Sequence, residues 1–304
     1  MRRFKGILYI ALGASSYGVL ATFVRVANSE GAHNSILNFS QFVFGVLFLL
    51  LFMLVQRKRT PQPAPRTSKN SLGKLLLFGT TLGMTSIFYY LSVQYIPVSV
   101  GIVMLMQSVW MSIVVEAVRT PKAITPIKIL GGLSVIFGSV LASNVVYAEL
   151  QLDWRGIALG MLAAMSFTTS MFASNSVALE LPNSRRSLYL VIGGLVATIL
   201  FWNLRIVEHF DLYLFVKWGL FLSFFGTFLP PLLFTKGFPI TGTALGGIVS
   251  SMELPVSVLC AHWVLSEAVA PVQWVGIGVM LLSVALINLK PRKKTAVDPG
   301  STSN

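Results

Sequence analysis

Charged residues are scarce in this sequence, and acidic residues are the scarcest of them. Only 11% of the 304 residues are Asp, Glu, Lys or Arg, whereas 55% are hydrophobic. This balance excludes an ordinary water-soluble domain and makes a lipid bilayer the expected surroundings of most of the chain. The single cysteine, Cys260, excludes an internal disulfide.

Residues that carry common enzymatic chemistry in membranes are also few. The three histidines form no H-E-x-x-H zinc motif, and no G-x-x-x-x-G-K-[ST] loop is present to bind a nucleotide. The three aspartates lie outside the apolar runs, which excludes an intramembrane aspartyl pair. We therefore expect no catalytic residue, no metal site and no cofactor, and predict that the protein is not an enzyme. An intramembrane enzyme that pairs a serine with His262, and a lipid flippase, stay open as alternatives.

What the sequence does contain is apolar runs long enough for membrane-crossing helices. Such a helix needs about 20 residues to cross a hydrocarbon core of roughly 30 Å. The sequence therefore predicts an all-α integral membrane protein with ten transmembrane helices. Their expected limits are Phe4–Val24, Ser35–Val55, Leu72–Leu91, Val98–Val118, Pro126–Ser143, Trp154–Ser176, Ser187–Leu204, Leu212–Thr235, Thr241–Val264 and Pro271–Leu289.

The net charge of +13 is distributed unevenly between the two predicted sides of the membrane. If the N-terminus is cytoplasmic, nineteen Lys and Arg residues lie on the cytoplasmic side, and only Arg25, Arg155, Arg205 and Lys217 lie on the other. Such a bias orients membrane helices, so the positive charge does not require a nucleic-acid partner. We predict a multi-pass protein of the plasma membrane with both termini cytoplasmic, including a cytoplasmic tail at residues 291–304.

Similarity between the two halves predicts an internal repeat. Residues 4–7 match residues 154–157, and Pro126 near the end of the first half matches Pro271 near the end of the second. Each half has five helices, an odd number, so the second half enters the membrane from the opposite side. We expect two inverted five-helix repeats, at residues 1–145 and 150–290. Inverted repeats build many secondary transporters around a site near the membrane midplane, which predicts alternating access.

Local motifs in the last two predicted helices point to a known family. Pro255-Val256 is followed by Leu265-Ser266-Glu267 and by Gly276 and Gly278. With ten helices and a twin repeat, residues 4–290 resemble the EamA-type branch of the drug/metabolite transporter superfamily. Ser266 replaces the usual glycine of the family's Gly-Glu pair. The resemblance implies a carrier whose central cavity is lined by both repeats, and known relatives export amino acids, other metabolites or drugs.

Glu253 is the main candidate for a functional residue, because a carboxylate inside an apolar helix is costly and usually functional. Helical spacing places Gly246, Ser250, Glu253, Ser257 and Cys260 on one small and polar stripe. Glu253 is predicted to bind a substrate amine or to exchange a proton as the coupling ion. The alternative is that Glu253 only hydrogen-bonds a neighbouring helix.

Repeat alignment places Gln107 opposite Glu253, with Trp110 about one turn later, and predicts that Gln107 and Glu253 flank one cavity. A second stripe, Asn34, Asn38 and Gln41, is expected to line an outer vestibule, while Glu116 and His262 near helix ends rank lower. The expected partners are a small-molecule substrate and the lipid bilayer. The full set of expected substrate-binding residues is Glu253, Gln107, Trp110, Gln41, Asn38, Tyr17, Tyr90, Ser250, Ser257 and Ser166.

Overall fold

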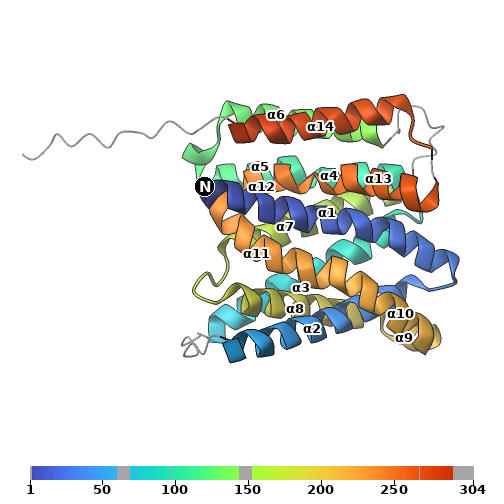
Figure 1. Cartoon of the computed structure of the whole chain (residues 1–304). Helices are drawn as coiled ribbons and strands as arrows, with labels where there is room; N and C mark the ends of the chain where they lie inside the picture. Colours follow the sequence, from blue (N-terminus) through green and yellow to red (C-terminus); the bar gives the residue numbers. More distant parts are fainter. Residues whose placement is uncertain (1, 60–68, 97, 144–152, 267, 290–304) are drawn as a thin grey trace, which may run out of the picture.

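The computed structural model describes residues 2–59, 69–96, 98–143, 153–266 and 268–289. These residues form a bundle of helices whose axes are broadly aligned, with no strand in the described part (Figure 1). Eight helical stretches are long and apolar enough to cross a membrane, and two shorter apolar helices accompany them. The predicted fold class, an all-helical membrane protein with repeated halves, is confirmed.

The helices lie close to the predicted spans. In chain order they are α1 (Arg2–Ser29), α2 (Asn34–Arg59), α3 (Lys69–Ser92), α4 (Val98–Met106), α5 (Ser108–Arg119), the 3-10 turn η1 (Pro121–Ala123), α6 (Pro126–Ala142), α7 (Trp154–Ser176), α8 (Asn183–Trp202), α9 (Leu204–Glu208), α10 (Leu212–Ser223), the π-helical turn η3 (Phe224–Phe228), α11 (Leu229–Thr241), α12 (Thr243–Ser250), α13 (Glu253–Leu265) and α14 (Pro271–Leu289).

Two spans that were predicted as continuous are each divided into two half-helices. The fourth span is interrupted at Gln107, whose N–H donates to the carbonyl of Met104, three residues earlier, at 3.0 Å. The ninth span is interrupted at Ser251 and Met252. Pro255 has no N–H to donate to the carbonyl of Ser251, which instead accepts from Leu254 at 3.1 Å. The two interruptions lie near equivalent positions of the two repeats.

The eighth span contains a π-helical turn rather than a break between two half-helices. The π-helical turn η3 separates α10 from α11, and Pro230 and Pro231 lie in the first turn of α11, where a missing N–H costs least. The irregular turn of this span therefore lies just before the two prolines.

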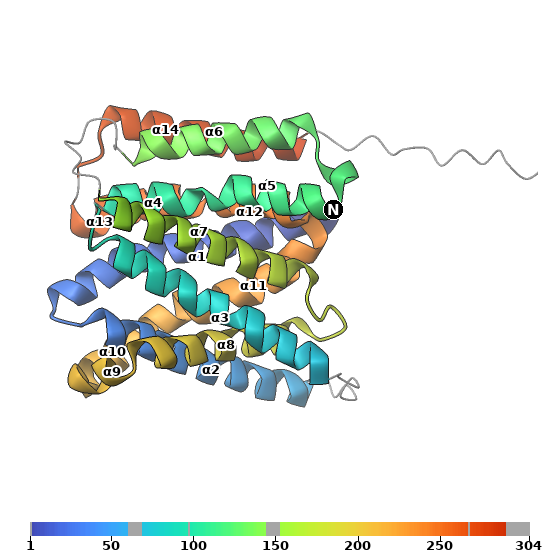
Figure 2. The ribbon, with the colours of Figure 1, turned by 180° about the vertical axis from the view of Figure 1, so that it is seen from behind.

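Close helix contacts hold the layers of the bundle together. Gly79 of α3 lies against the backbone of α8 at Leu190, where an added Cβ would collide with the Leu190 carbonyl. Small residues allow such an approach in membrane helices. The shorter helices α6 and α14 pair along one edge of the bundle, while α2 and α8 lie at the opposite edge (Figures 1 and 2).

The two ends of the bundle differ. Helix α1 begins and α14 ends at the same end, which we call the closed end (Figure 1). There Ile10 and Phe238, both fully buried, pack together with Gly246 of α12. The opposite end, which we call the open end, carries the mouth of a cavity described below.

Candidate functional site

A cavity of about 290 Å³ lies within the bundle, lined by α1, α2, α3, α4, α6, α7, η3, α13 and α14. Both halves of the chain therefore contribute to its walls. Asn28, Asn34, Val93 and Ser143 belong to the lining and lie at or near helix ends. These residues place the mouth of the cavity at the open end, while the buried core around Ile10 closes the other end.

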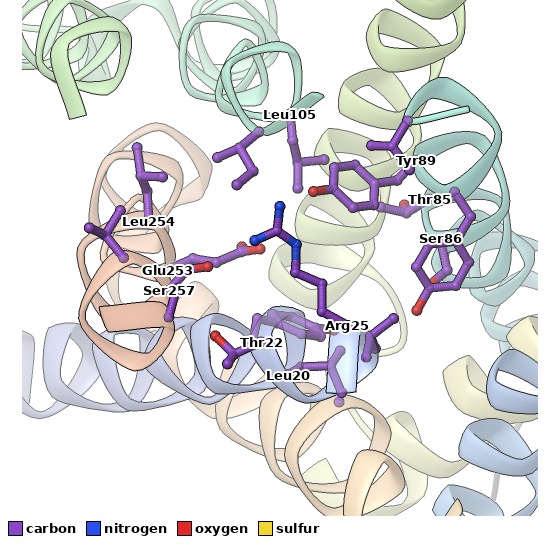
Figure 3. A pocket seen from close by; sticks show the side chains of 18 of the residues that line it. Leu20, Thr22, Arg25, Thr85, Ser86, Tyr89, Leu105, Glu253, Leu254 and Ser257 are labelled. Atoms are coloured by element: carbon purple, nitrogen blue, oxygen red, sulfur yellow. The ribbon is translucent and has the colours of Figure 1, made fainter. Parts of the chain in front are cut away.

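Glu253 is the first residue of the half-helix α13 and lines the cavity. Figure 3 shows its side chain extending from α13 into the open space. Its Oε2 is buried and has no hydrogen-bond partner among the described residues. The interruption before α13 puts this carboxylate at a helix N-terminus, where the partial positive charge of the helix favours an anion. The ninth span is thus broken beside the cavity, as are helices that bind substrates in many transporters.

Arg25 faces this carboxylate from the other side of the cavity. It lies in the last turns of α1, and Figure 3 shows its guanidinium directed toward Glu253 and Tyr89. Tyr89 of α3 lines the same cavity as Arg25 and Glu253. The cavity therefore contains one guanidinium group and one carboxyl group, supplied by different repeats.

Buried polar oxygens line the same cavity on α1 and α2. Thr22 is 2% exposed and Gln41 is 3% exposed, yet Thr22 Oγ1 and Gln41 Oε1 have no hydrogen-bond partner in the described part of the chain. The Oδ1 of Asn34 is also buried and unpartnered there. Burying such groups without a partner is unfavourable, so they are suited to a polar solute or to water within the cavity.

Half of the expected site residues line the cavity, and half do not. Those in the lining are Glu253, Gln41, Tyr17, Tyr90 and Ser257. Gln107, Trp110, Asn38, Ser250 and Ser166 are not part of it.

Gln107 does not meet Glu253 across the cavity. Its Nε2 donates to the Val103 carbonyl at 3.1 Å, and its Oε1 accepts from the indole N–H of Trp110 at 3.0 Å. Both partners lie on the same span, and neither Val103 nor Trp110 is among the residues that line the cavity. The Trp110 side chain is 39% exposed on the surface of the bundle.

Asn38 and Ser250 are buried outside the cavity lining. Asn38 is fully buried, and neither atom of its amide has a partner among the described residues. Ser250 donates to the Gly246 carbonyl of its own helix at 2.9 Å. Ser166 of α7 is half-buried.

The sequence analysis missed Arg25, which was counted among the loop charges of the outer side. The first helix was expected to end at Val24, because a charged residue was taken as a boundary, but α1 continues to Ser29. A usable signal was present: Thr22, Arg25 and Asn28 recur at intervals of three and form one polar helical stripe, and all of them line the cavity.

Comparisons with known proteins agree with this geometry. The model of the EamA-like transporter family matches residues 4–144 and again residues 154–289. No curated protein matches the chain. A crystal structure described only as that of a protein is 14% identical and has a TM-score of 0.77, over 96% of this chain and 99% of its own. That likeness concerns the fold alone. Because the family model covers both halves, the chain belongs to the EamA-like transporter family and is a membrane transporter of the drug/metabolite type.

Proposed function

We propose that this protein is a secondary transporter that exports a small organic solute carrying both an amine and a carboxylate, such as an amino acid. The observation that carries the proposal is the pair of opposite charges, Glu253 and Arg25, directed toward one another across a cavity. A carboxylate suits a substrate ammonium group, and a guanidinium binds a substrate carboxylate through two parallel hydrogen bonds. The volume of about 290 Å³ suits a small solute rather than a large lipid. Export is the direction that the family resemblance favours.

Alternating access around this cavity is the mechanism we propose. The repeats at residues 1–145 and 150–290 would rock against one another, so that the cavity opens first at one end and then at the other. The cavity is open at the end opposite the start of α1 and the end of α14. A zwitterion bound between Glu253 and Arg25 would place its carboxylate at Arg25 and its ammonium group at Glu253. Proton binding by Glu253 would couple transport to a pH gradient.

A proteoliposome uptake screen tests the substrate class directly. The purified protein would be offered amino acids, nucleosides and organic cations, each with and without a pH gradient. We expect amino acids to be taken up and a pH gradient to drive their accumulation. Uptake of organic cations or nucleosides without amino acids would contradict the proposal.

Replacing Arg25 by glutamine is expected to weaken amino-acid transport by about 10- to 100-fold, because a charge-assisted hydrogen bond to the substrate carboxylate is lost. Arg25→Lys should retain part of the activity, since it keeps the charge but not the planar fork. Arg205→Gln is the matched control: Arg205 is exposed, lies at the same end and does not line the cavity. Equal transport by Arg25→Gln and Arg205→Gln would contradict a role in substrate binding.

Both termini are proposed to face the cytoplasm of a cell whose plasma membrane holds the protein. In a Cys260→Ser background, cysteines at Ser68 and Ser301, which lie outside the described residues, should resist a membrane-impermeant maleimide added to intact cells. A cysteine at Glu208, exposed at the open end, should react and serves as the positive control. Labelling of Ser68→Cys or Ser301→Cys with the same efficiency would reverse the proposed orientation.

A further inference from the structure

Glu116 of α5 joins three elements at the closed end. Its carboxylate is 7% exposed, and Oε1 pairs with Nζ of Lys128 on α6 at 2.5 Å. Oε2 accepts a hydrogen bond from the backbone N–H of Ala244 in α12 at 2.7 Å. Lys128, 11% exposed, also donates to the Ala123 carbonyl of η1 at 2.9 Å. The bond from Ala244 to Glu116 connects the second half of the chain to the first.

This hydrogen bond gives the start of α12 an acceptor that the residue preceding the helix cannot supply. The first N–H groups of a helix have no partner within the helix. The residue before α12 is Gly242, which has no side chain to cap them and has φ of +84°. A Cβ at Gly242 would lie 2.8 Å from Glu116 Oε2, so glycine also leaves room for the carboxylate. Glu116 therefore caps α12 from the other half of the chain.

Helix α12 links this contact to the cavity. It runs from Thr243 at the closed end to Ser250, and after the two-residue interruption Glu253 begins α13 at the cavity wall. The same short helix thus has Glu116 at one end and the cavity carboxylate just beyond the other. An opening of the closed end that separates α12 from α5 would have to break the bond between Glu116 and Ala244.

At the repeat-related positions, which lie toward the opposite end, the described residues are of other types. The offset that relates Gln107 to Glu253 relates Glu116 to His262, and the offset that relates Pro126 to Pro271 relates Lys128 to Gln273. A carboxylate and an ammonium group are thus replaced by an imidazole and an amide. The Glu30–Lys217 pair does join the halves at the open end, but its side chains are 37% and 38% exposed. Water screens such a pair much more than a buried one.

We propose that Glu116, held by Lys128, is the lock of the closed end and biases the empty transporter toward the conformation open at the other end. The inference rests on the alternating access proposed above. It assigns to Glu116 a role in the conformational balance, with no contact to the substrate.

Spin labels across the closed end test this lock. In the Cys260→Ser background, cysteines replace Lys122 in η1 and Pro239 in α11, both exposed, one in each half. We expect one main distance in the parent protein. Glu116→Ala should add a longer distance, with the ratio of open to closed molecules raised roughly tenfold or more. Glu116→Gln keeps an acceptor oxygen without the charge, so it should give a smaller shift. It is the conservative variant to measure if Glu116→Ala does not fold.

The charge-swapped variant Glu116→Lys/Lys128→Glu separates the two contacts. It can restore the ion pair, but an ammonium group cannot accept from Ala244 N–H. We expect it to behave like Glu116→Ala. Glu180→Ala, an exposed carboxylate between α7 and α8, is the control and should leave the distance unchanged.

Two results would overturn the lock, and they differ in what they say of the transporter. If a mixture of the common amino acids lengthens the distance in the parent while Glu116→Ala matches the parent without substrate, alternating access stands and the lock is wrong. If neither the parent with amino acids nor any variant shows a second distance, both the lock and alternating access fail. Restoration of the parent distances by the swapped pair would assign the effect to the ion pair alone and reject the cap on α12.

Discussion

Glu253→Gln is expected to fold, to reach the membrane and to lose transport by about 10- to 100-fold, because an amide replaces the only cavity carboxylate found among the lining residues. Glutamine keeps the size of the side chain and most of its hydrogen bonding, but it cannot carry a negative charge or exchange a proton. The amine of a zwitterionic substrate would then lose its counter-ion. Substrate uptake and its response to a pH gradient, measured in proteoliposomes, check this expectation.

The control for Glu253→Gln is Glu208→Gln, which makes the same chemical change at an exposed position of α9. It should transport at the rate of the unaltered protein. If Glu253→Gln also did so, with the same response to pH, Glu253 would only connect helices. A variant with normal transport but no response to pH would keep the proton-exchange role and reject the role in substrate binding.

Arg186→Met is expected to lower the free energy of unfolding by about 3–5 kcal/mol. Arg186 of α8 is 1% exposed, and its guanidinium donates to four backbone carbonyls. These belong to Val177 (2.9 Å), Thr235 (3.0 Å), Ala173 (3.3 Å) and Ser174 (2.7 Å), so one side chain joins α8 to the end of α7 and to α11. Methionine fills similar space but removes the donors that Arg186 gives to these buried carbonyls, which is costly.

Thermal unfolding in detergent measures this effect. We expect the melting temperature of Arg186→Met to fall by roughly 10 °C. The neighbouring Arg185→Met is the matched control, since Arg185 is only half-buried, and it should change the melting temperature little. Similar melting temperatures for the two variants would show that the four carbonyls do not depend on Arg186.

The spans were predictable because length and apolarity are local properties of the sequence. Two predicted spans, Trp154–Ser176 and Pro271–Leu289, have the same limits in the structure. The interruption at Gln107 was not predictable in this way, because no proline or glycine marks it and it depends on how α4 and α5 pack against other helices. The charged residue Arg25 misled the prediction in the opposite sense, since a cation suggested a helix end where α1 continues along a polar cavity.

Site residues were predictable from the sequence when a polar group stood in an apolar run. They were less predictable when they were chosen by alignment of the two repeats. Glu253 stood out as a carboxylate in an apolar run, and it lines the cavity. Gln107 was chosen from its alignment with Glu253, but an alignment relates backbone positions and does not fix where a side chain points. The indole N–H of Trp110 donates a hydrogen bond to Gln107. The importance of Glu116 was underestimated, because only the folded chain brings Ala244 to it.

The π-helical turn Phe224–Phe228 changes the helical phase of the eighth span. One extra residue in a turn rotates everything that follows by about 100°, the angle of one residue in an α-helix. Accordingly α10 packs mainly on α2, whereas α11 packs mainly on α1, and Ser16 of α1 donates to the Phe225 carbonyl at 2.6 Å. The repeat counterpart α3 has no such turn. Deleting one residue within the turn would therefore realign α11 with α10 and direct its whole inner half at the wrong neighbours, although every residue of α11 itself would be unchanged.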